Sequence, residues 1–221
     1  MTRGTFIVGN ESALCRAVEA ETIKRVDKYA CAFIPNKLSE TISSDLSSES
    51  ENEKCQSLDW NPSSPISARA LVLAAENRLE AIDEAILVCS PPVIRSSPSG
   101  LSFSTVEIMV NDHIKGWFFL VKEITKMFKN RERGTLALVY PDIASGKEVD
   151  ILGASALSSF RTLVQCLLSS ANKEPYSTIG FSTTDSGNET AFASFIYKSI
   201  DELSKRSNGK LFKFGKFSFF K

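Results

Sequence analysis

The sequence predicts an α/β fold: a doubly wound parallel sheet of Rossmann-like type, with about seven strands and helices on both faces. Short continuous apolar runs at residues 85–88 and 135–140 are typical of strands buried on both faces. Segments with helical spacing of apolar residues lie between such runs, and strands that alternate with helices pair in parallel. Turn residues follow several of the runs, among them Gly9, Pro35 and Pro91.

The expected elements alternate along the chain. We expect strands at residues 5–8, 29–34, 56–59 (a short one), 85–88, 135–140, 176–181 and within 210–221. We expect helices at residues 12–24, from 64–65 onward, and at 105–129, 152–168 and 189–205. Ser64 and Pro65 mark a helix start, because serine caps a helix and proline suits its first position.

Residues 36–61 differ in kind from the rest of the chain. They are rich in serine and acidic residues and lack any apolar periodicity. A segment of this composition can bury little apolar surface, so we expect a flexible surface loop within a single domain of residues 1–221. A phosphorylated regulatory tract is the alternative to a plain solvated loop, which the composition favours.

Composition and charge exclude several function classes. Lys plus Arg and Asp plus Glu are 26 each, so no net field favours nucleic acid or a membrane surface as partner. No run approaches the ~18 consecutive apolar residues that span a bilayer, and no signal peptide is evident. The single histidine and five scattered cysteines predict no metal site. We therefore expect a soluble cytoplasmic protein with reduced thiols.

Two segments carry a resemblance to a known family. Residues 8–17, Val-Gly-Asn-Glu-Ser-Ala-Leu-Cys-Arg-Ala, are similar to the Thr-Gly-x-x-x-Gly-Ile-Gly-Arg-Ala loop of the short-chain dehydrogenases/reductases. Residues 113–120, His-Ile-Lys-Gly-Trp-Phe-Phe-Leu, are similar to that family's Asn-x-x-Gly-x-Phe helix segment. The order of landmarks resembles the family over nearly the whole chain. The resemblance implies a Rossmann fold and oxidoreductase chemistry with NAD or NADP, although the residues themselves predict no cofactor.

The resemblance also implies which residues would contact a dinucleotide. Only the first glycine of the loop is retained, because Ala13 and Cys15 replace the other two and crowd the space that a pyrophosphate needs. A lysine after the second strand meets either a 2′-phosphate or solvent, and solvent is favoured. Cys89, which stands in place of the family's Asn-Asn-Ala-Gly segment, is either a nucleophile or a structural thiol, and the structural thiol is favoured because no second histidine exists to pair with it. The implied cofactor-binding residues are Gly9, Asn10, Ser12, Leu14, Lys37 and Cys89.

The family's catalytic Tyr-x-x-x-Lys pair is missing. Depending on the register, its tyrosine falls on Asp150 or Leu152 and its lysine on Ala154 or Ala156. The strand that ends in the family's catalytic serine ends here in Tyr140 and a proline. Since the tyrosine is the family's general acid/base, its loss predicts loss of hydride chemistry.

If the protein is active, the resemblance leaves two candidate catalytic residues. His113 aligns with the family's active-site asparagine, with Asn111 two residues earlier, and a histidine there can exchange protons near neutral pH. The simpler interpretation of His113 is a hydrogen-bonded residue on a partly buried helix, and this is favoured. Tyr140 with Lys147 is a weaker candidate, because seven residues and a turn separate them.

The resemblance implies a scaffold more strongly than a reaction. The favoured function is that of a catalytically inactive short-chain-dehydrogenase-like protein, a pseudoenzyme that acts by binding or oligomeric assembly. In the family, the helices that match residues 105–129 and 152–168 pair across a subunit interface, and here both helices are unusually apolar. We therefore expect a homodimer or homotetramer through these helices and the C-terminal tail. The alternatives are an NAD(P)-dependent oxidoreductase with an atypical active site and a small-ligand binding protein.

Overall fold

The computed structural model describes residues 3–25, 28–34, 57–142, 150–185, 187–202 and 207–215. Within them lies one sheet of six parallel strands in the order β2-β1-β3-β4-β5-β6. The strands are β1 (Gly4–Asn10), β2 (Lys28–Ile34), β3 (Glu84–Val88), β4 (Thr135–Pro141), β5 (Ser177–Thr183) and β6 (Leu211–Phe214). The predicted Rossmann-like fold is confirmed.

The predicted strand count of about seven is wrong for the described residues. The short strand expected at residues 56–59 does not form over its described part, Ser57 to Asp59. Leu58 N donates one hydrogen bond to Cys31 O (2.7 Å), and the chain then turns so that Trp60 enters the core. A strand needs a ladder of such bonds beside β2, and a single bond does not make one.

Helices connect the strands close to the predicted positions. They are α1 (Ala13–Arg25), α3 (Pro65–Leu79), α4 (Phe103–Val110), α5 (Gly116–Arg131), α6 (Ile151–Ser170) and α7 (Glu189–Asp201), with 3₁₀ turns η1 (Pro98–Gly100) and η3 (Ala171–Lys173). Ser64 caps α3, because its Oγ accepts a hydrogen bond from Ser67 N, and Pro65 follows as expected. Most of the segment 36–61 and the end of the C-terminal tail lie outside the described residues.

The helix predicted at 105–129 is longer and not uniform. It runs from Phe103 to Arg131 as α4, a π-helical turn η2 (Asn111–Lys115) and α5. In the π turn Gly116 N donates to Asn111 O, five residues earlier, so the helix gains one residue locally. Apolar spacing alone does not reveal this insertion, because the buried face resumes after the turn.

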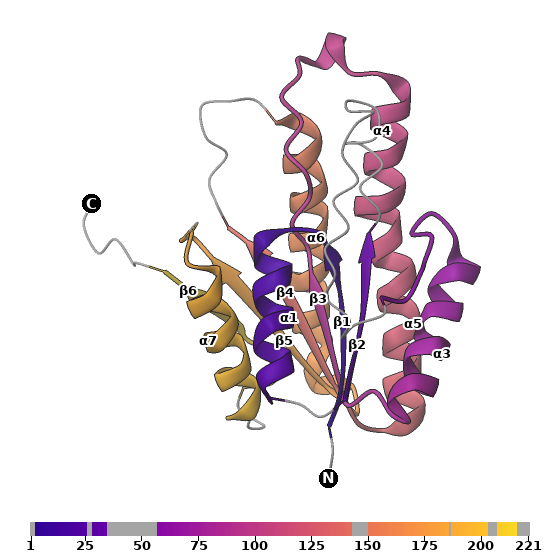
Figure 1. The fold of residues 1–221 in the computed structure, drawn as a ribbon, viewed down its shortest axis with the longest axis vertical. Helices are drawn as coiled ribbons and strands as arrows, with labels where there is room; N and C mark the ends of the chain where they lie inside the picture. The colour runs from indigo at the N-terminus through magenta and orange to yellow at the C-terminus, as the bar shows by residue number, and fades with distance from the viewer. Residues whose placement is uncertain are drawn as a thin grey trace.

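Two apolar cores lie on opposite faces of the sheet (Figure 1). Side chains of α3, α5 and α6 pack on one face, and those of α1 and α7 pack on the other. The helices α1 and α7 lie on the same face of the sheet. The first leads from β1 to β2, toward one edge of the sheet, whereas the second leads from β5 to β6, toward the other edge. The crossover through α7 therefore has the opposite hand to the crossover through α1. Right-handed crossovers are the strong rule, so α7 is an exception that needs contacts to hold it.

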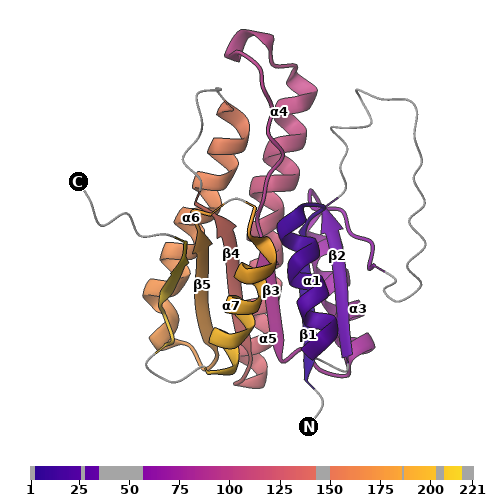
Figure 2. The same ribbon diagram turned by 60° about the vertical axis from the view of Figure 1, so that its left-hand side comes forward.

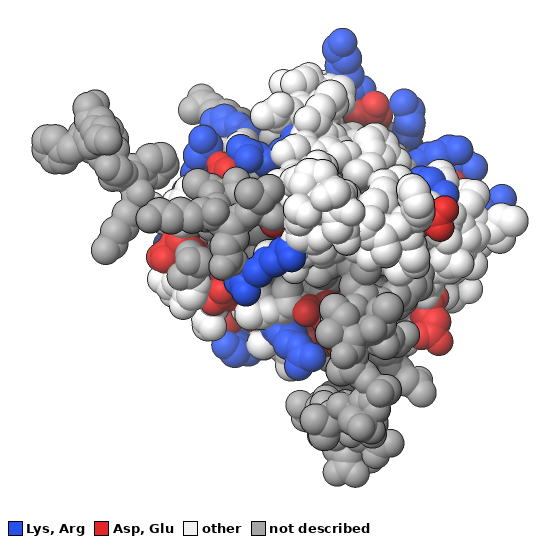
Figure 3. Space-filling view, turned by 90° about the horizontal axis from the view of Figure 1, so that it is seen from above, with Lys and Arg blue, Asp and Glu red and all other residues white. Residues whose placement is uncertain are grey.

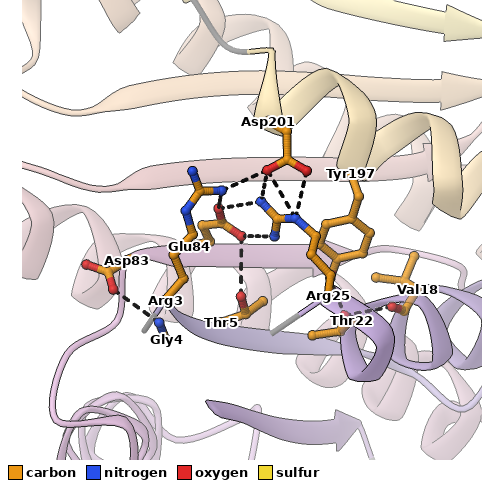
Figure 4. Close-up of polar contacts among 10 residues, drawn as sticks. All are labelled: Arg3, Gly4, Thr5, Val18, Thr22, Arg25, Asp83, Glu84, Tyr197 and Asp201. Carbon is orange, nitrogen blue, oxygen red and sulfur yellow. Dashed lines mark hydrogen bonds and ion pairs between the residues drawn. The ribbon is translucent and has the colours of Figure 1, made fainter. Parts of the chain in front are cut away.

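Charged side chains join α1 and α7 at the amino edge of the sheet (Figure 4). Arg25, the last residue of α1, donates to both carboxylate oxygens of Glu84 (2.7 and 3.0 Å) and also to Asp201 at the end of α7. Arg3 contacts the same two acids at 3.3 and 2.8 Å. The Arg25 guanidinium also lies over the Tyr197 ring, 4.8 Å from its centroid.

Candidate functional site at the carboxyl edge of the sheet

The turn between β1 and α1 lies at the carboxyl edge of the sheet, where doubly wound folds bind ligands. Ser12 Oγ accepts a hydrogen bond from Cys15 N (3.2 Å), and Ser12 N donates to Asn10 O (2.7 Å). No residue from Gly9 to Cys15 has a positive φ. Ala13 and Cys15, which replace the family's second and third glycines, therefore adopt this turn without backbone strain.

Gly9 and Cys15 form the contact between β1 and α1. A Cβ on Gly9 would lie 2.5 Å from Cys15 Sγ and 3.0 Å from Val88 O, so glycine is required here by close approach. Cys15 is fully buried, and burial raises the pKa of its thiol to about 12. Its sulfur thus fills the space between helix and strand instead of serving as a nucleophile.

Asn10, the last residue of β1, joins three separate segments. Its Oδ1 accepts a hydrogen bond from Ser90 N (3.1 Å), just beyond β3, and its Nδ2 lies 2.9 Å from His113 Nδ1 on the π turn. Asn10 and His113 are both buried, at 6% and 4% exposure. The structure therefore brings together two residues that the sequence proposed for different roles, and it adds Ser90, which the sequence did not single out.

The π turn places two neighbouring polar side chains in the protein interior. Asp112 is 1% exposed and His113 is 4% exposed. A Cβ on Gly116 would lie 2.7 Å from Pro62 Cβ, so this glycine lets the turn approach the segment before α3. π turns are frequent at functional sites. Gly116, the glycine retained in the sequence match, is thus the residue that allows the π turn to pack closely against the segment before α3.

Tyr140 is buried beneath α6 rather than open to the carboxyl edge. It is 2% exposed, and its ring lies 6.3 Å from that of Phe160 in an edge-on arrangement. Arg161 lies 5.9 Å from the Tyr140 ring and forms an ion pair with Asp142 (3.0 Å). Burial raises the pKa of the Tyr140 phenol. Lys147, its suggested partner, lies outside the described residues.

The start of α6 carries a cap where the family carries its tyrosine and lysine. Asp150 Oδ1 accepts hydrogen bonds from Gly153 N (2.9 Å) and from Ile94 N (3.3 Å), so the carboxylate caps the helix and ties it to the segment after β3. Leu152 is half-buried, and Ala156 is completely buried against the core. Neither register of the family's motif provides a phenol or an ammonium group here.

The remaining predicted residues divide between the interior and the part that is not described. Cys89 is completely buried, its backbone N–H donates to Val139 O (2.9 Å), and burial raises the pKa of its thiol. Leu14 is buried against the core on the α1 face. Lys37 lies outside the described residues. Within the described residues, no three His, Cys, Asp or Glu side chains group as metal ligands would.

One stretch, Ile151–Lys173, is long and apolar enough to cross a membrane by length and composition. Its most apolar 18-residue window has a mean hydropathy of 1.4, and 22% of that window is buried. The sequence prediction concerned consecutive apolar residues, which this stretch does not provide because Ser, Gly, Arg and Gln interrupt it. Core helices of soluble proteins also meet this criterion, so it is weak evidence.

Comparison with known proteins assigns the architecture. The sequence matches no family model and no curated protein. A short-chain dehydrogenase from Mycobacterium smegmatis superposes with a TM-score of 0.71 at 9% identity, over 97% of this chain and 92% of the other. The chain has the fold of the short-chain dehydrogenases/reductases. That resemblance, first based on the residues of the loop and the helix segment, is confirmed at the level of the fold.

Two further structures with this fold hold a dinucleotide. The NADH-dependent reductase A1-R′, complexed with NAD, has a TM-score of 0.72 at 10% identity and covers 96% of this chain and 95% of its own. ElxO with NADP bound has a TM-score of 0.69 at 14% identity, over 96% and 97% of the two chains. At such low identity the likeness shows the shared fold alone, so the site residues must be judged on their own geometry.

The described residues of this chain do not form a complete dinucleotide site. The carboxylate of Glu11 precedes α1, where the helix N-terminus would attract a diphosphate, and is held at 3.6 Å by Arg16. The Asn10 carboxamide is already bonded to Ser90 and His113. The side chains at the start of α1 are therefore engaged in contacts within the protein.

Proposed function

We propose that this protein is a short-chain-dehydrogenase-like scaffold that acts by binding and oligomeric assembly, not by hydride transfer. The observation that carries the proposal is the start of α6, where an aspartate cap, a half-buried leucine and a buried alanine stand at the family's tyrosine and lysine positions. Proton transfer by a positioned group contributes about 10²–10⁴-fold to a reaction. Without that group, hydride transfer has no proton donor at this position, and we expect no binding of the dinucleotide that would supply the hydride.

Assembly is supported by the surface of the two helices predicted to pair. α4 and the first half of α6 rise beyond the carboxyl edge of the sheet (Figure 2), and Arg161 is the one charged residue of α6. Phe103, Val110 and Phe118 are 93%, 42% and 49% exposed. Figure 3 shows the molecule from the carboxyl edge of the sheet, and the middle of this view contains few charged side chains. Interface cores are depleted of charge in this way.

The proposed assembly is a homodimer or homotetramer of a soluble cytoplasmic protein. Its contacts are the helix from Phe103 to Arg131, α6 and the C-terminal tail, and neither nucleic acid nor a membrane takes part. A face of two adjacent helices with few charges, which can pair with the same face of a second copy, suits a twofold interface. Sedimentation of the full chain at micromolar concentration tests this: we expect a dimer or tetramer, and a monomer would contradict the proposal.

A second candidate function is an NAD(P)-dependent oxidoreductase with an atypical active site. The observation that favours it is His113, a buried imidazole placed at the carboxyl edge beside the β1–α1 turn. In that function His113 is the first candidate for proton transfer. Tyr140 is the weaker candidate because it is buried beneath α6.

A thermal shift measurement separates the two functions. A ligand that binds the folded state at about 100 times its Kd stabilises that state by about 2.7 kcal/mol, which raises Tm by several degrees. We expect no change in Tm with NAD or NADP at millimolar concentration. The control is ADP-ribose, which shares the adenosine and diphosphate groups. A clear rise with NAD or NADP would contradict the scaffold proposal, and a rise with ADP-ribose as well would place the binding at the β1–α1 turn.

A further inference from the structure

The contacts of Asn10 determine which way its side-chain amide points. A carboxamide has one end that accepts hydrogen bonds and one that donates them. A backbone N–H can only donate, so the Asn10 atom 3.1 Å from Ser90 N must be Oδ1. The other end, Nδ2, therefore faces His113 Nδ1 at 2.9 Å. The orientation follows from the Ser90 contact and not from a choice between two equivalent poses.

This orientation in turn fixes the form of the imidazole. Asn10 Nδ2 is a donor, so His113 Nδ1 must present its lone pair and carry no proton. A neutral imidazole then has its one proton on Nε2. The reverse tautomer, and the imidazolium ion, would both point an N–H at the N–H of Asn10 across 2.9 Å.

We infer that Asn10 is a positioning residue that fixes His113 as the neutral Nε2–H tautomer. It does so by tying the end of β1 to the segment after β3 and to the π turn. In this form the imidazole can donate at Nε2 but cannot accept a proton there. Any group that meets Nε2 must therefore bring an acceptor, such as a carbonyl, hydroxyl or phosphate oxygen. The inference goes beyond the proposed function, because it concerns the free protein whichever function applies.

His113 is the single histidine of the chain, so the test has one signal to assign. In the full-length protein, uniformly labelled with ¹⁵N, long-range ¹H–¹⁵N correlation spectra distinguish a protonated ring nitrogen from an unprotonated one. Near neutral pH we expect Nδ1 to be unprotonated and Nε2 to be protonated. A spectrum with the proton on Nδ1, or with both nitrogens protonated, would overturn the inference without any variant.

Substitutions of Asn10 show whether this residue is the cause. In Asn10→Asp the carboxylate has acceptors only, so we expect Nδ1 to become protonated. In Asn10→Ala the donor that faces Nδ1 is removed, and we expect the fraction of molecules protonated at Nδ1 to rise above that of the wild type. Asn111→Ala is the control, because Asn111 lies on the same turn and bonds Lys115 (2.9 Å) instead of His113; it should leave the imidazole signals unchanged.

The outcomes separate a positioning role from a merely structural one. If Asn10 only stabilises the fold, the folded molecules of Asn10→Asp keep the ring proton on Nε2, as in the wild type. Such a spectrum would contradict the inference. If Asn10→Asp does not fold, the wild-type spectrum and Asn10→Ala still decide it. No dinucleotide is present in these samples, so failure here is independent of the thermal shift result.

Discussion

Arg25 makes most of the polar contacts at the amino edge of the sheet (Figure 4). Its side chain is 14% exposed and that of Glu84 is 6% exposed, so this ion pair is largely shielded from water. Thr5 Oγ1 adds a hydrogen bond to Glu84 (3.3 Å). Hydrogen bonding to Arg25 also lowers the pKa of Asp201. One guanidinium therefore satisfies a buried acid on β3 and holds the end of α7.

We predict that Arg25→Met destabilises the protein by about 3 kcal/mol, because removing one partner of a buried pair leaves an uncompensated charge. The matched control is Arg3→Met, which removes a side chain that is 51% exposed from the same two acids. It should cost less than about 1 kcal/mol, as exposed ion pairs do. Urea unfolding of the three proteins measures both effects. Equal losses would contradict the assignment of Arg25 as the principal partner.

The buried thiol of Cys15 makes the stability of the protein depend on pH in alkaline solution. The pKa of its thiol is 9.0 ordinarily and about 12 in the folded protein, because burial disfavours the thiolate. Above pH 9 the unfolded chain loses this proton and the folded chain keeps it, so unfolding becomes more favourable as pH rises toward about 12.

We expect the free energy of unfolding to fall by roughly 1 kcal/mol per pH unit more steeply in the wild type than in Cys15→Ala. Urea unfolding of both proteins at about pH 8 and about pH 10.5 measures the two slopes. Burial raises the pKa of Cys89 and Tyr197 as well, so the variant should retain part of the decline. Parallel slopes for the two proteins would show that Cys15 is not the titrating group.

The β1–α1 turn forms without two of the three glycines of the loop that it resembles. Its backbone uses no positive φ between Gly9 and Cys15, so alanine and cysteine are tolerated where the family has glycine. The remaining glycine is needed for a different reason, the closeness of Cys15 Sγ. The two positions are therefore coupled through packing.

We predict that Gly9→Ala destabilises the wild type by about 1–3 kcal/mol, the usual cost of overpacking. The same change should cost less in a Cys15→Ala background, where the sulfur no longer meets the new methyl group. Val88 O stays 3.0 Å from the added Cβ, so some cost should remain. Unfolding of the four proteins gives the coupling energy of the pair. Additive costs would refute this account of the glycine.

At the scale of the whole molecule, α6 has one side that a single copy leaves exposed. Thr162 and Cys166 lie four residues apart on its exposed side, and the neighbouring exposed positions are also uncharged. α7 presents its outer side to solvent on the opposite face of the sheet, where no partner is proposed.

We expect Cys166→Glu to dissociate the assembly at micromolar concentration, because a carboxylate buried in an uncharged interface loses its hydration without gaining a cationic partner. Ser194→Glu, at an exposed position of α7, should leave the assembly intact. Sedimentation of both variants beside the wild type gives the result. Dissociation by both substitutions, or by neither, would exclude α6 as the interface.

The order of the elements could be predicted from the sequence, because buried parallel strands and the helices between them have distinct apolar patterns. Ser64 and Pro65 placed the start of α3, and the predicted strands 5–8, 85–88 and 135–140 lie within β1, β3 and β4. The strand expected at 56–59 does not form over residues 57–59, because the chain makes one bond to the edge strand β2 and then turns so that Trp60 enters the core.

The candidate site, like the fold, could be predicted only in part from the sequence. The sequence by itself determined which residue types are present: a single histidine, no tyrosine and lysine pair at the start of α6, and one retained glycine before α1. Tertiary structure alone decided that Asn10 meets His113 across 103 positions of chain and that α7 lies on the face of α1. Local patterns report which side of an element is buried, but the partner buried against it depends on contacts between segments far apart in sequence.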